Sequence, residues 1–250
     1  MESFFGIILS IVFGAIFGSY ATLFAYRLPR QESCFGRYFG PKSRCPKCGI
    51  TIITRDLIPL INWIITFGKC RNCKNKIPRI HLFVEITTTI LFLICYLNFS
   101  FSEKFIIYAM ISVSLVVLLA CDITHKIFPQ PVLIFLLFFI TIDRVIDDQT
   151  ILNIIYSAIV GVIIVSIFIK IFSEKLNYFF SNKTQLYDYS KFILIASLGL
   201  NYLEFLYYSV VVMVILTFLS AIHIIGKKNP LNFGYVFIIP YIWTIFLINN

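Results

Sequence analysis

The sequence predicts an all-α polytopic membrane protein with about eight transmembrane helices and a small cytoplasmic insert that carries four cysteines. Of its 250 residues, 59% are hydrophobic and only 13% are charged, and the mean hydropathy is +0.90. A soluble domain of this size could not bury so much apolar surface. Long apolar runs in lipid are expected to be helices, because the backbone there must satisfy its own hydrogen bonds.

Eight apolar segments supply the expected spans, each of which needs roughly 20 residues to cross a bilayer. The first segment is too long for the core of a signal peptide, and it ends in Tyr26-Arg27-Leu28-Pro29 rather than at a small-residue cleavage site. We therefore expect it to be retained as a helix. The fourth and sixth segments are short for full spans. The segments are about 4–26, 82–100, 104–121, 130–142, 151–172, 190–203, 205–225 and 233–249.

The largest polar gap, Arg27 to His81, holds 12 of the 21 lysines and arginines. Positive residues favour the cytoplasmic side of a membrane, so this insert is assigned to the cytoplasm. With eight spans, only Lys104 and Arg144 lie outside, and both termini are outside. The net charge of +9 is then explained by membrane topology, so no nucleic-acid partner is expected. Within the insert, 57–67 is apolar but too short to span, and we expect it on the membrane surface or in a small core.

Four cysteines in the insert form two C-x-x-C pairs separated by 21 residues, namely Cys45, Cys48, Cys70 and Cys73. This spacing is typical of a closed, structural zinc site with four thiolate ligands. The alternatives are two disulfides or reduced structural cysteines. A cytosolic location disfavours disulfides. Cys34, Cys95 and Cys121 stand alone and are interpreted as ordinary small apolar residues.

Carboxylates in or beside apolar spans are costly, and each one needs a reason. Asp122 ends the third segment and Asp188 precedes the sixth. In the predicted topology, both lie at the cytoplasmic ends of helices, where they could form an aspartic dyad that shares one proton. The alternatives are that Asp122 is a loop residue paired with Lys126, and that Asp188 caps the sixth helix. The acids of the 143–150 loop (Asp143, Asp147 and Asp148) are expected to be solvated.

The order of these features resembles the type IV prepilin peptidase family, whose members are aspartic peptidases of the GxGD type. Residues 18–29 are similar to the first-helix signature of that family, with Thr22 in place of the usual Asn. The two C-x-x-C pairs and the stretch from Ile77 to Glu85 resemble its zinc domain. Asp122, followed seven residues later by Pro129, resembles its first catalytic motif. Asn232-Phe233-Gly234 resembles its turn into the last helix.

One departure concerns the second aspartate of the family, which lies in a Gly-x-Gly-Asp turn followed closely by Lys. Here the matching stretch is Gln185-Leu186-Tyr187-Asp188, without glycine, and Lys191 comes one residue later than in the family pattern. A turn that requires glycine would strain Tyr187. Either the turn is rebuilt around Asp188 or the site is damaged.

The resemblance implies a bacterial inner-membrane endopeptidase that removes the leader of type IV prepilins or pseudopilins at the cytoplasmic face, in pilus assembly or protein secretion. Asp122 and Asp188 would be catalytic, zinc would be structural, and S-adenosylmethionine would serve a possible N-methyltransferase activity, with no visible cofactor loop. The expected partners are prepilin substrates and membrane lipids. The expected parts are a first helix (1–26), the zinc-binding domain (27–81) and a seven-helix peptidase domain (82–250).

Two other classes of function remain open. The first is an inactive member of the family that binds prepilin or an assembly partner, which the missing glycines favour. The second is a small-solute transporter with a zinc-stabilised cytoplasmic domain, although no paired inverted halves are visible.

Overall fold

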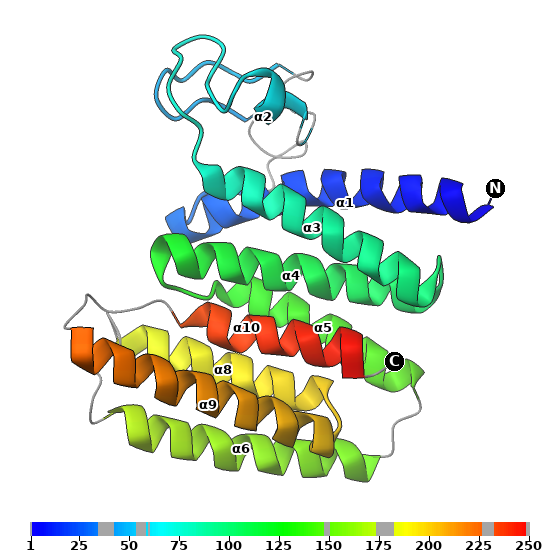
Figure 1. The fold of residues 1–250 in the computed structure, drawn as a ribbon, viewed down its shortest axis with the longest axis vertical. Helices are drawn as coiled ribbons and strands as arrows, with labels where there is room; N and C mark the ends of the chain where they lie inside the picture. The colour runs from blue at the N-terminus through cyan, green and yellow to red at the C-terminus, as the bar shows by residue number, and fades with distance from the viewer. Residues whose placement is uncertain are drawn as a thin grey trace. The chain divides into compact units, whose positions relative to one another are not determined.

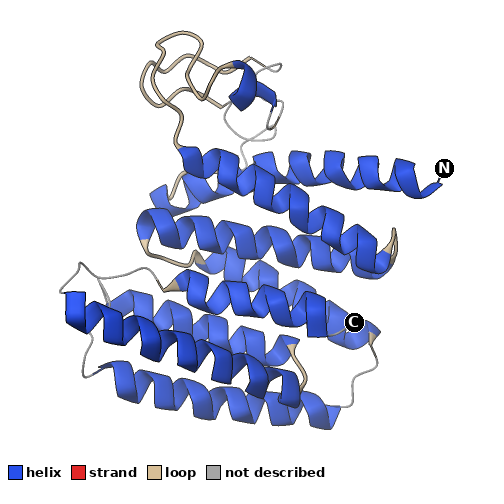
Figure 2. Ribbon diagram, in the orientation of Figure 1, coloured by secondary structure: helices blue, strands red, loops and turns tan. Residues whose placement is uncertain are grey.

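The computed structural model describes residues 2–34, 43–53, 59, 61–147, 151–173, 183–226 and 233–248. Within these ranges the chain is helical, with isolated bridges and no strand (Figures 1 and 2). It divides into two compact units, Met1–Ala120 and Cys121–Asn250, which we describe separately. The division into 1–26, 27–81 and 82–250 stays a prediction.

Each predicted apolar segment overlaps a helix of the described chain. Five of these helices (α1, α3, α4, α6 and α9) are long and apolar enough to cross a membrane, and 234–246 is a shorter apolar helix. The all-α polytopic fold is thus confirmed, whereas the count of eight spans stays a prediction. The bounds are α1 Glu2–Arg27, α3 Arg79–Phe99, α4 Glu103–His125, α5 Gln130–Ile146, α6 Ile151–Ser173, α8 Lys183–Gly199, α9 Tyr202–Gly226 and α10 Gly234–Trp243, which continues as a π-helical turn Thr244–Ile248.

In the first unit, α1 packs along α3 through glycines spaced four residues apart (Figure 1). A Cβ atom on Gly14 would lie 2.8 Å from the Cα of Thr89, and one on Gly18 would lie 2.9 Å from the Cα of Glu85. Small residues at this spacing let two helix backbones approach in a membrane, where packing rather than the hydrophobic effect drives association. The α1–α3 pair therefore depends on the absence of side chains at these two positions.

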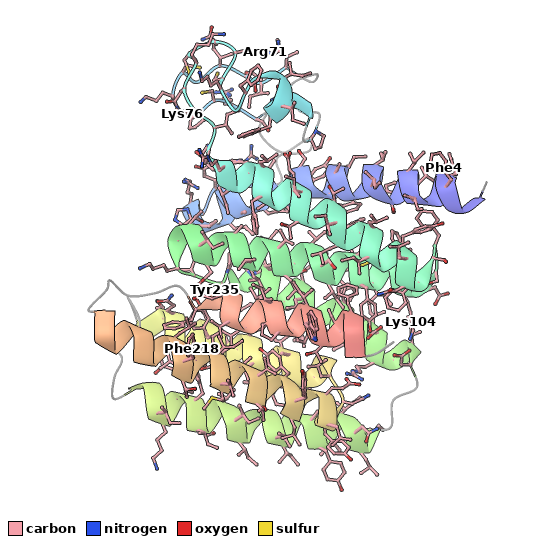
Figure 3. All side chains as sticks on the ribbon, in the orientation of Figure 1. Phe4, Arg71, Lys76, Lys104, Phe218 and Tyr235 are labelled. Carbon is pink, nitrogen blue, oxygen red and sulfur yellow. The ribbon has the colours of Figure 1, made fainter. Side chains whose placement is uncertain are left out.

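The insert between α1 and α3 begins with a 3-10 turn, Leu28–Arg30, and contains a short helix α2, Ile61–Ile65. Its basic side chains include Arg71 and Lys76 (Figure 3). Ile64, Ile65 and Phe67 are exposed. The described part of the apolar segment 57–67 therefore does not form a buried core, while residues 57, 58 and 60 lie outside the described ranges.

In the second unit, α8 turns one face toward α10. Tyr189 and Phe192 of α8 are fully buried, and their rings lie 5.0 Å from Phe237 and 5.8 Å from Tyr241, respectively. Aromatic pairs at such distances contribute about 0.5–1.5 kcal/mol beyond the area that they bury. This packing fixes the rotation of α8 about its own axis, and therefore which of its side chains faces inward.

A polar network ties α5 to the turn between α8 and α9. The Arg144 guanidinium donates to the Leu198 carbonyl at 3.0 Å and to Oδ1 of Asn201 at 3.1 Å. Glu204 accepts from the backbone N–H of Asn201 at 3.0 Å.

Asp143 is also buried, on α5, so the expectation that it is solvated was wrong. The error arose because α5 continues to Ile146, beyond the predicted end at 142; Asp148 lies outside the described residues.

Candidate functional site

Asp122 lies on the last turn of α4 and is fully buried. Its Oδ1 accepts a hydrogen bond from the Tyr189 hydroxyl at 2.6 Å, and its Oδ2 accepts one from the backbone N–H of Gly234 at 3.0 Å. The alternative placed Asp122 in a loop and paired it with Lys126; the structure places it within α4. A buried carboxylate persists only where hydrogen bonds replace its hydration, and this one has a donor on each oxygen.

The donor at Gly234 is the first residue of α10, and Phe233 is the N-cap. The expected turn into the last helix is present at Phe233 and Gly234, while Asn232 lies outside the described residues. The N-terminus of a helix carries partial positive charge, which favours a carboxylate there. A Cβ atom at residue 234 would lie 2.6 Å from Cγ of Asp122, so only glycine leaves room for the carboxylate.

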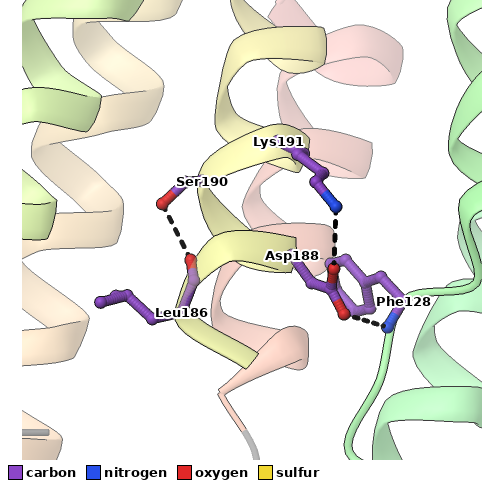
Figure 4. A network of polar contacts seen from close by, with 5 residues as sticks. All are labelled: Phe128, Leu186, Asp188, Ser190 and Lys191. Carbon is purple, nitrogen blue, oxygen red and sulfur yellow. Dashed lines mark hydrogen bonds and ion pairs between the residues drawn. The ribbon is translucent and has the colours of Figure 1, made fainter. Parts of the chain in front are cut away.

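Asp188 occupies the second turn of α8, on the half-buried side of that helix (Figure 4). Its Oδ2 accepts from the backbone N–H of Phe128 at 3.2 Å, and its Oδ1 lies 3.4 Å from Nζ of Lys191. Since α8 begins at Lys183, Asp188 is not an N-cap as the alternative proposed. Its carboxylate anchors the segment that joins α4 to α5.

Within the described residues, Asp122 and Asp188 do not hydrogen-bond to each other. From α8, Asp122 is contacted by Tyr189, the chain neighbour of Asp188, and by Gln185. An α-helix turns by about 100° per residue, so two consecutive side chains cannot face the same point. The two carboxylates thus occupy the same part of the second unit, with the Tyr189 phenol directly against Asp122.

The missing glycines have a simple structural explanation. Gln185, Leu186 and Tyr187 lie inside α8, with no positive φ angle in this stretch. A helical backbone accepts these side chains without strain. Asp188 is therefore presented by a helix and not by a glycine turn.

In the insert, the four predicted cysteines come together: the sulfurs of Cys45, Cys48, Cys70 and Cys73 all lie within 4.8 Å of one another. The sulfurs of Cys45 and Cys73 are 3.8 Å apart. Four thiolates at about 2.3 Å from a zinc ion would place neighbouring sulfurs of the tetrahedron about 3.8 Å apart. The thiols are free rather than joined as disulfides. The donor set and its spacing fit zinc.

The two C-x-x-C pairs form matching knuckles. In each, the first cysteine carbonyl accepts from an N–H four residues later, that of Gly49 at 2.9 Å and that of Lys74 at 3.0 Å. Both of these residues have left-handed backbones, with φ of 70° and 57°. The Ile50 backbone N–H lowers the pKa of the Cys48 thiol to about 7, which favours the thiolate that a metal requires.

The sequence did not single out Tyr189 or Gln185. Gln185 donates from Nε2 to the Tyr189 hydroxyl at 2.8 Å, and both side chains are fully buried. The one available signal was their i, i+4 spacing on a helix with an acid between them. The contact of Tyr189 with a residue 67 positions away could not be read from that spacing.

Comparison with known proteins gives matches over part of the chain. The family described as "Bacterial Peptidase A24 N-terminal domain" matches residues 12–99. A "Prepilin leader peptidase/N-methyltransferase" of Vibrio cholerae is 35% identical over 112 residues, which are 43% of this chain and 44% of that protein. One of Bacillus subtilis is 31% identical over 137 residues, 54% and 53% of the two chains. A "Type 4 prepilin-like proteins leader peptide-processing enzyme" of Escherichia coli is 30% identical over 139 residues, 49% and 51%.

The chain spans about half the length of the curated relatives that it matches. No solved structure gives a significant match. The helices and the four-thiol cluster define a multi-pass membrane protein whose insert has four thiols that could hold a metal ion. The sequence matches, which cover part of the chain, support a relationship to the type IV prepilin peptidase family.

Proposed function

We propose that this chain is a membrane aspartic endopeptidase that removes the leader peptide of type IV prepilins or pseudopilins at the cytoplasmic face of a bacterial inner membrane. The observation that carries the proposal is the Asp122 carboxylate, buried at one end of a membrane helix and held by donors from α8 and α10. The names of the relatives, which describe leader peptidases, point in the same direction.

In the proposed reaction, the pair Asp122 and Asp188 begins with Asp122 ionised and one proton on Asp188. Asp122 takes a proton from water as the water oxygen bonds to the peptide carbonyl carbon, and the carbonyl electron pair moves onto its oxygen. The C–N bond then breaks and the leaving amine takes the proton from Asp188. The pair again holds one proton, now on Asp122, and return of that proton to Asp188 restores the starting state. Each carboxylate oxygen has two lone pairs, so Asp122 can accept from water while it keeps its bonds to Tyr189 and Gly234.

The zinc that we propose for the insert would be held by Cys45, Cys48, Cys70 and Cys73. With four protein ligands it has no open position, so it would stabilise the insert and take no part in cleavage. The word "N-methyltransferase" in the names of relatives suggests methylation of the new N-terminus with S-adenosylmethionine. We assign no residue of this chain to that methyl donor.

The decisive experiment is cleavage of a prepilin by the full chain in detergent, beside Asp122→Asn and Asp188→Asn. Loss of one catalytic carboxylate is expected to slow cleavage by at least about 100-fold, the scale of general acid–base catalysis. Thermal unfolding of each variant serves as the control for folding. Wild-type protein that cuts no prepilin, although it is folded and zinc-loaded, would reject the proposed activity.

The second candidate is a family member that binds prepilin without cutting it. It is favoured by the Tyr189 hydroxyl, which lies against the Asp122 oxygen at the place where a second carboxylate would complete a dyad. Prepilin that co-purifies uncut with the wild-type chain, together with no cleavage by any preparation, would support this candidate over the first.

A further inference from the structure

The Tyr189 hydroxyl is a junction of three hydrogen bonds. The Gln185 side-chain amide donates to it at 2.8 Å, and the Phe233 backbone N–H donates to it at 3.2 Å. A phenol has one proton to give. With two donors aimed at its oxygen, that proton is directed to the remaining neighbour, Oδ1 of Asp122, at 2.6 Å.

The other oxygen of Asp122 faces a group that can only donate. The Gly234 backbone N–H lies 3.0 Å from Oδ2, at the N-terminus of α10. Both oxygens of Asp122 therefore act as acceptors, the arrangement that an ionised carboxylate requires. The partial positive charge of the helix end adds to this preference.

The ring of Tyr189 is held on both sides by other rings. Phe128 meets it edge-on at 5.2 Å and Phe237 lies at 5.0 Å, and Tyr189 has no exposed surface. The ring therefore cannot turn its hydroxyl away without moving its neighbours. The hydroxyl holds the Asp122 carboxylate in a fixed orientation.

We propose that Tyr189 is a positioning residue that keeps Asp122 ionised and oriented as the base of the site. This inference rests on the proposed function, because it concerns the same carboxylate. It adds a third side chain to the two aspartates and assigns the proton-accepting role to Asp122. Gln185 supports the same arrangement, because its side chain donates to the Tyr189 hydroxyl and also hydrogen-bonds to Asp122.

The first test compares Tyr189→Phe with Tyr187→Phe in prepilin cleavage by the full chain. Tyr187 lies on the same helix and is exposed, so it is a matched control for the loss of a phenol oxygen. Tyr189→Phe is expected to lower kcat by about 10–100-fold with little change in KM, because the base loses its orientation. Tyr187→Phe is expected to cut like wild type. Equal kcat for Tyr189→Phe and wild type would overturn the proposal.

The second test does not depend on cleavage. Infrared difference spectra against Asp122→Asn report whether the Asp122 carboxyl carries a proton. The proposal expects no protonated-carboxyl band from Asp122 in wild type at neutral pH, and a new band in Tyr189→Phe. A band from Asp122 already present in wild type, or none in Tyr189→Phe, would overturn it.

The cleavage test and the infrared test distinguish failure of the proposed function from failure of the proposed role of Tyr189. Wild-type protein that never cuts rejects the proposed function, and the infrared comparison still decides the role of Tyr189. If Tyr189→Phe does not fold, Gln185→Ala takes its place, because it leaves the phenol but removes one of its two donors together with the Gln185 hydrogen bond to Asp122. Gln185→Ala is expected to show a smaller fall in kcat than Tyr189→Phe, and a weaker protonated-carboxyl band from Asp122. Wild-type kcat together with no band in folded Gln185→Ala would then count against the proposal.

Discussion

The backbone N–H of Gly234 lies 3.0 Å from Oδ2 of Asp122, although 112 residues separate the two in the chain. The contact joins the end of α4 to the beginning of α10. It depends on the hydrogen side chain of residue 234, because any Cβ atom there would overlap the carboxylate.

Gly234→Ala is therefore expected to displace Asp122. Overpacking of a buried site costs about 1–3 kcal/mol, and we expect cleavage to fall at least about 10-fold as the carboxylate moves. Thermal unfolding and prepilin cleavage in detergent measure the two effects. Ile239→Ala, on the exposed side of the same helix, is the control and is expected to cut normally. Normal cleavage by Gly234→Ala would contradict this close packing.

The four-cysteine cluster predicts one zinc ion per chain. Cys48→Ser is expected to abolish stoichiometric zinc in elemental analysis, because the tetrahedral site loses a thiolate. Cys34→Ser, in the same insert but outside the cluster, is expected to keep it. Chelation should expose the insert to protease, since metal binding and folding are coupled in such small sites. An insert that resists protease equally with and without metal would show that zinc does not hold it together.

The α1–α3 interface predicts a strong effect of Gly18→Val. The new side chain would press on the backbone of Glu85, whose Cα would lie 2.9 Å from the added Cβ. Overpacking on this scale costs about 1–3 kcal/mol, which thermal unfolding in detergent would measure. Val12→Leu, on the exposed face of α1, is expected to change little. Small and equal shifts of the unfolding temperature in Gly18→Val and Val12→Leu would mean that stability does not depend on the close approach of α1 and α3 at Gly18.

The second cysteine knuckle predicts a stabilising substitution. Lys74 holds a left-handed backbone with φ of 57°, where the first knuckle uses Gly49. Removing the Cβ strain is expected to gain about 1 kcal/mol, partly offset by the entropy that glycine adds to the unfolded chain. Competition with a chromophoric chelator should show tighter zinc retention in Lys74→Gly. Lys76→Gly, at a position without positive φ, should retain zinc no more tightly than wild type. Equal zinc retention in Lys74→Gly and Lys76→Gly would refute the strain argument.

The sequence was sufficient for the features that depend on local spacing. The two C-x-x-C pairs predicted the cluster, because a tetrahedral thiolate site needs two tight turns and each pair supplies one. Apolar run length predicted the helices, because lipid leaves the backbone few alternatives. The spacing of Gly14 and Gly18 in α1 also indicated close packing against another helix, which the length of an apolar run does not.

The rest depended on tertiary contacts. The hydrogen bond from Tyr189 to Asp122 results from how α8 is rotated against α10, and that rotation is set by rings far apart in sequence. The burial of Asp143 likewise depends on how far α5 extends, and helix ends are the least certain feature of any sequence pattern. The catalytic roles of Asp122 and Asp188 stay predictions.

Because residues 185–191 form continuous helix, the side chain that faces Asp122 is decided by register. Each residue inserted into or removed from such a helix rotates its C-terminal part by about 100° relative to its N-terminal part. Lys191 stands one residue later than in the family pattern, a shift of that size. A gain or loss of one codon in this helix could thus exchange a carboxylate for a phenol opposite Asp122 while every helix stays in place.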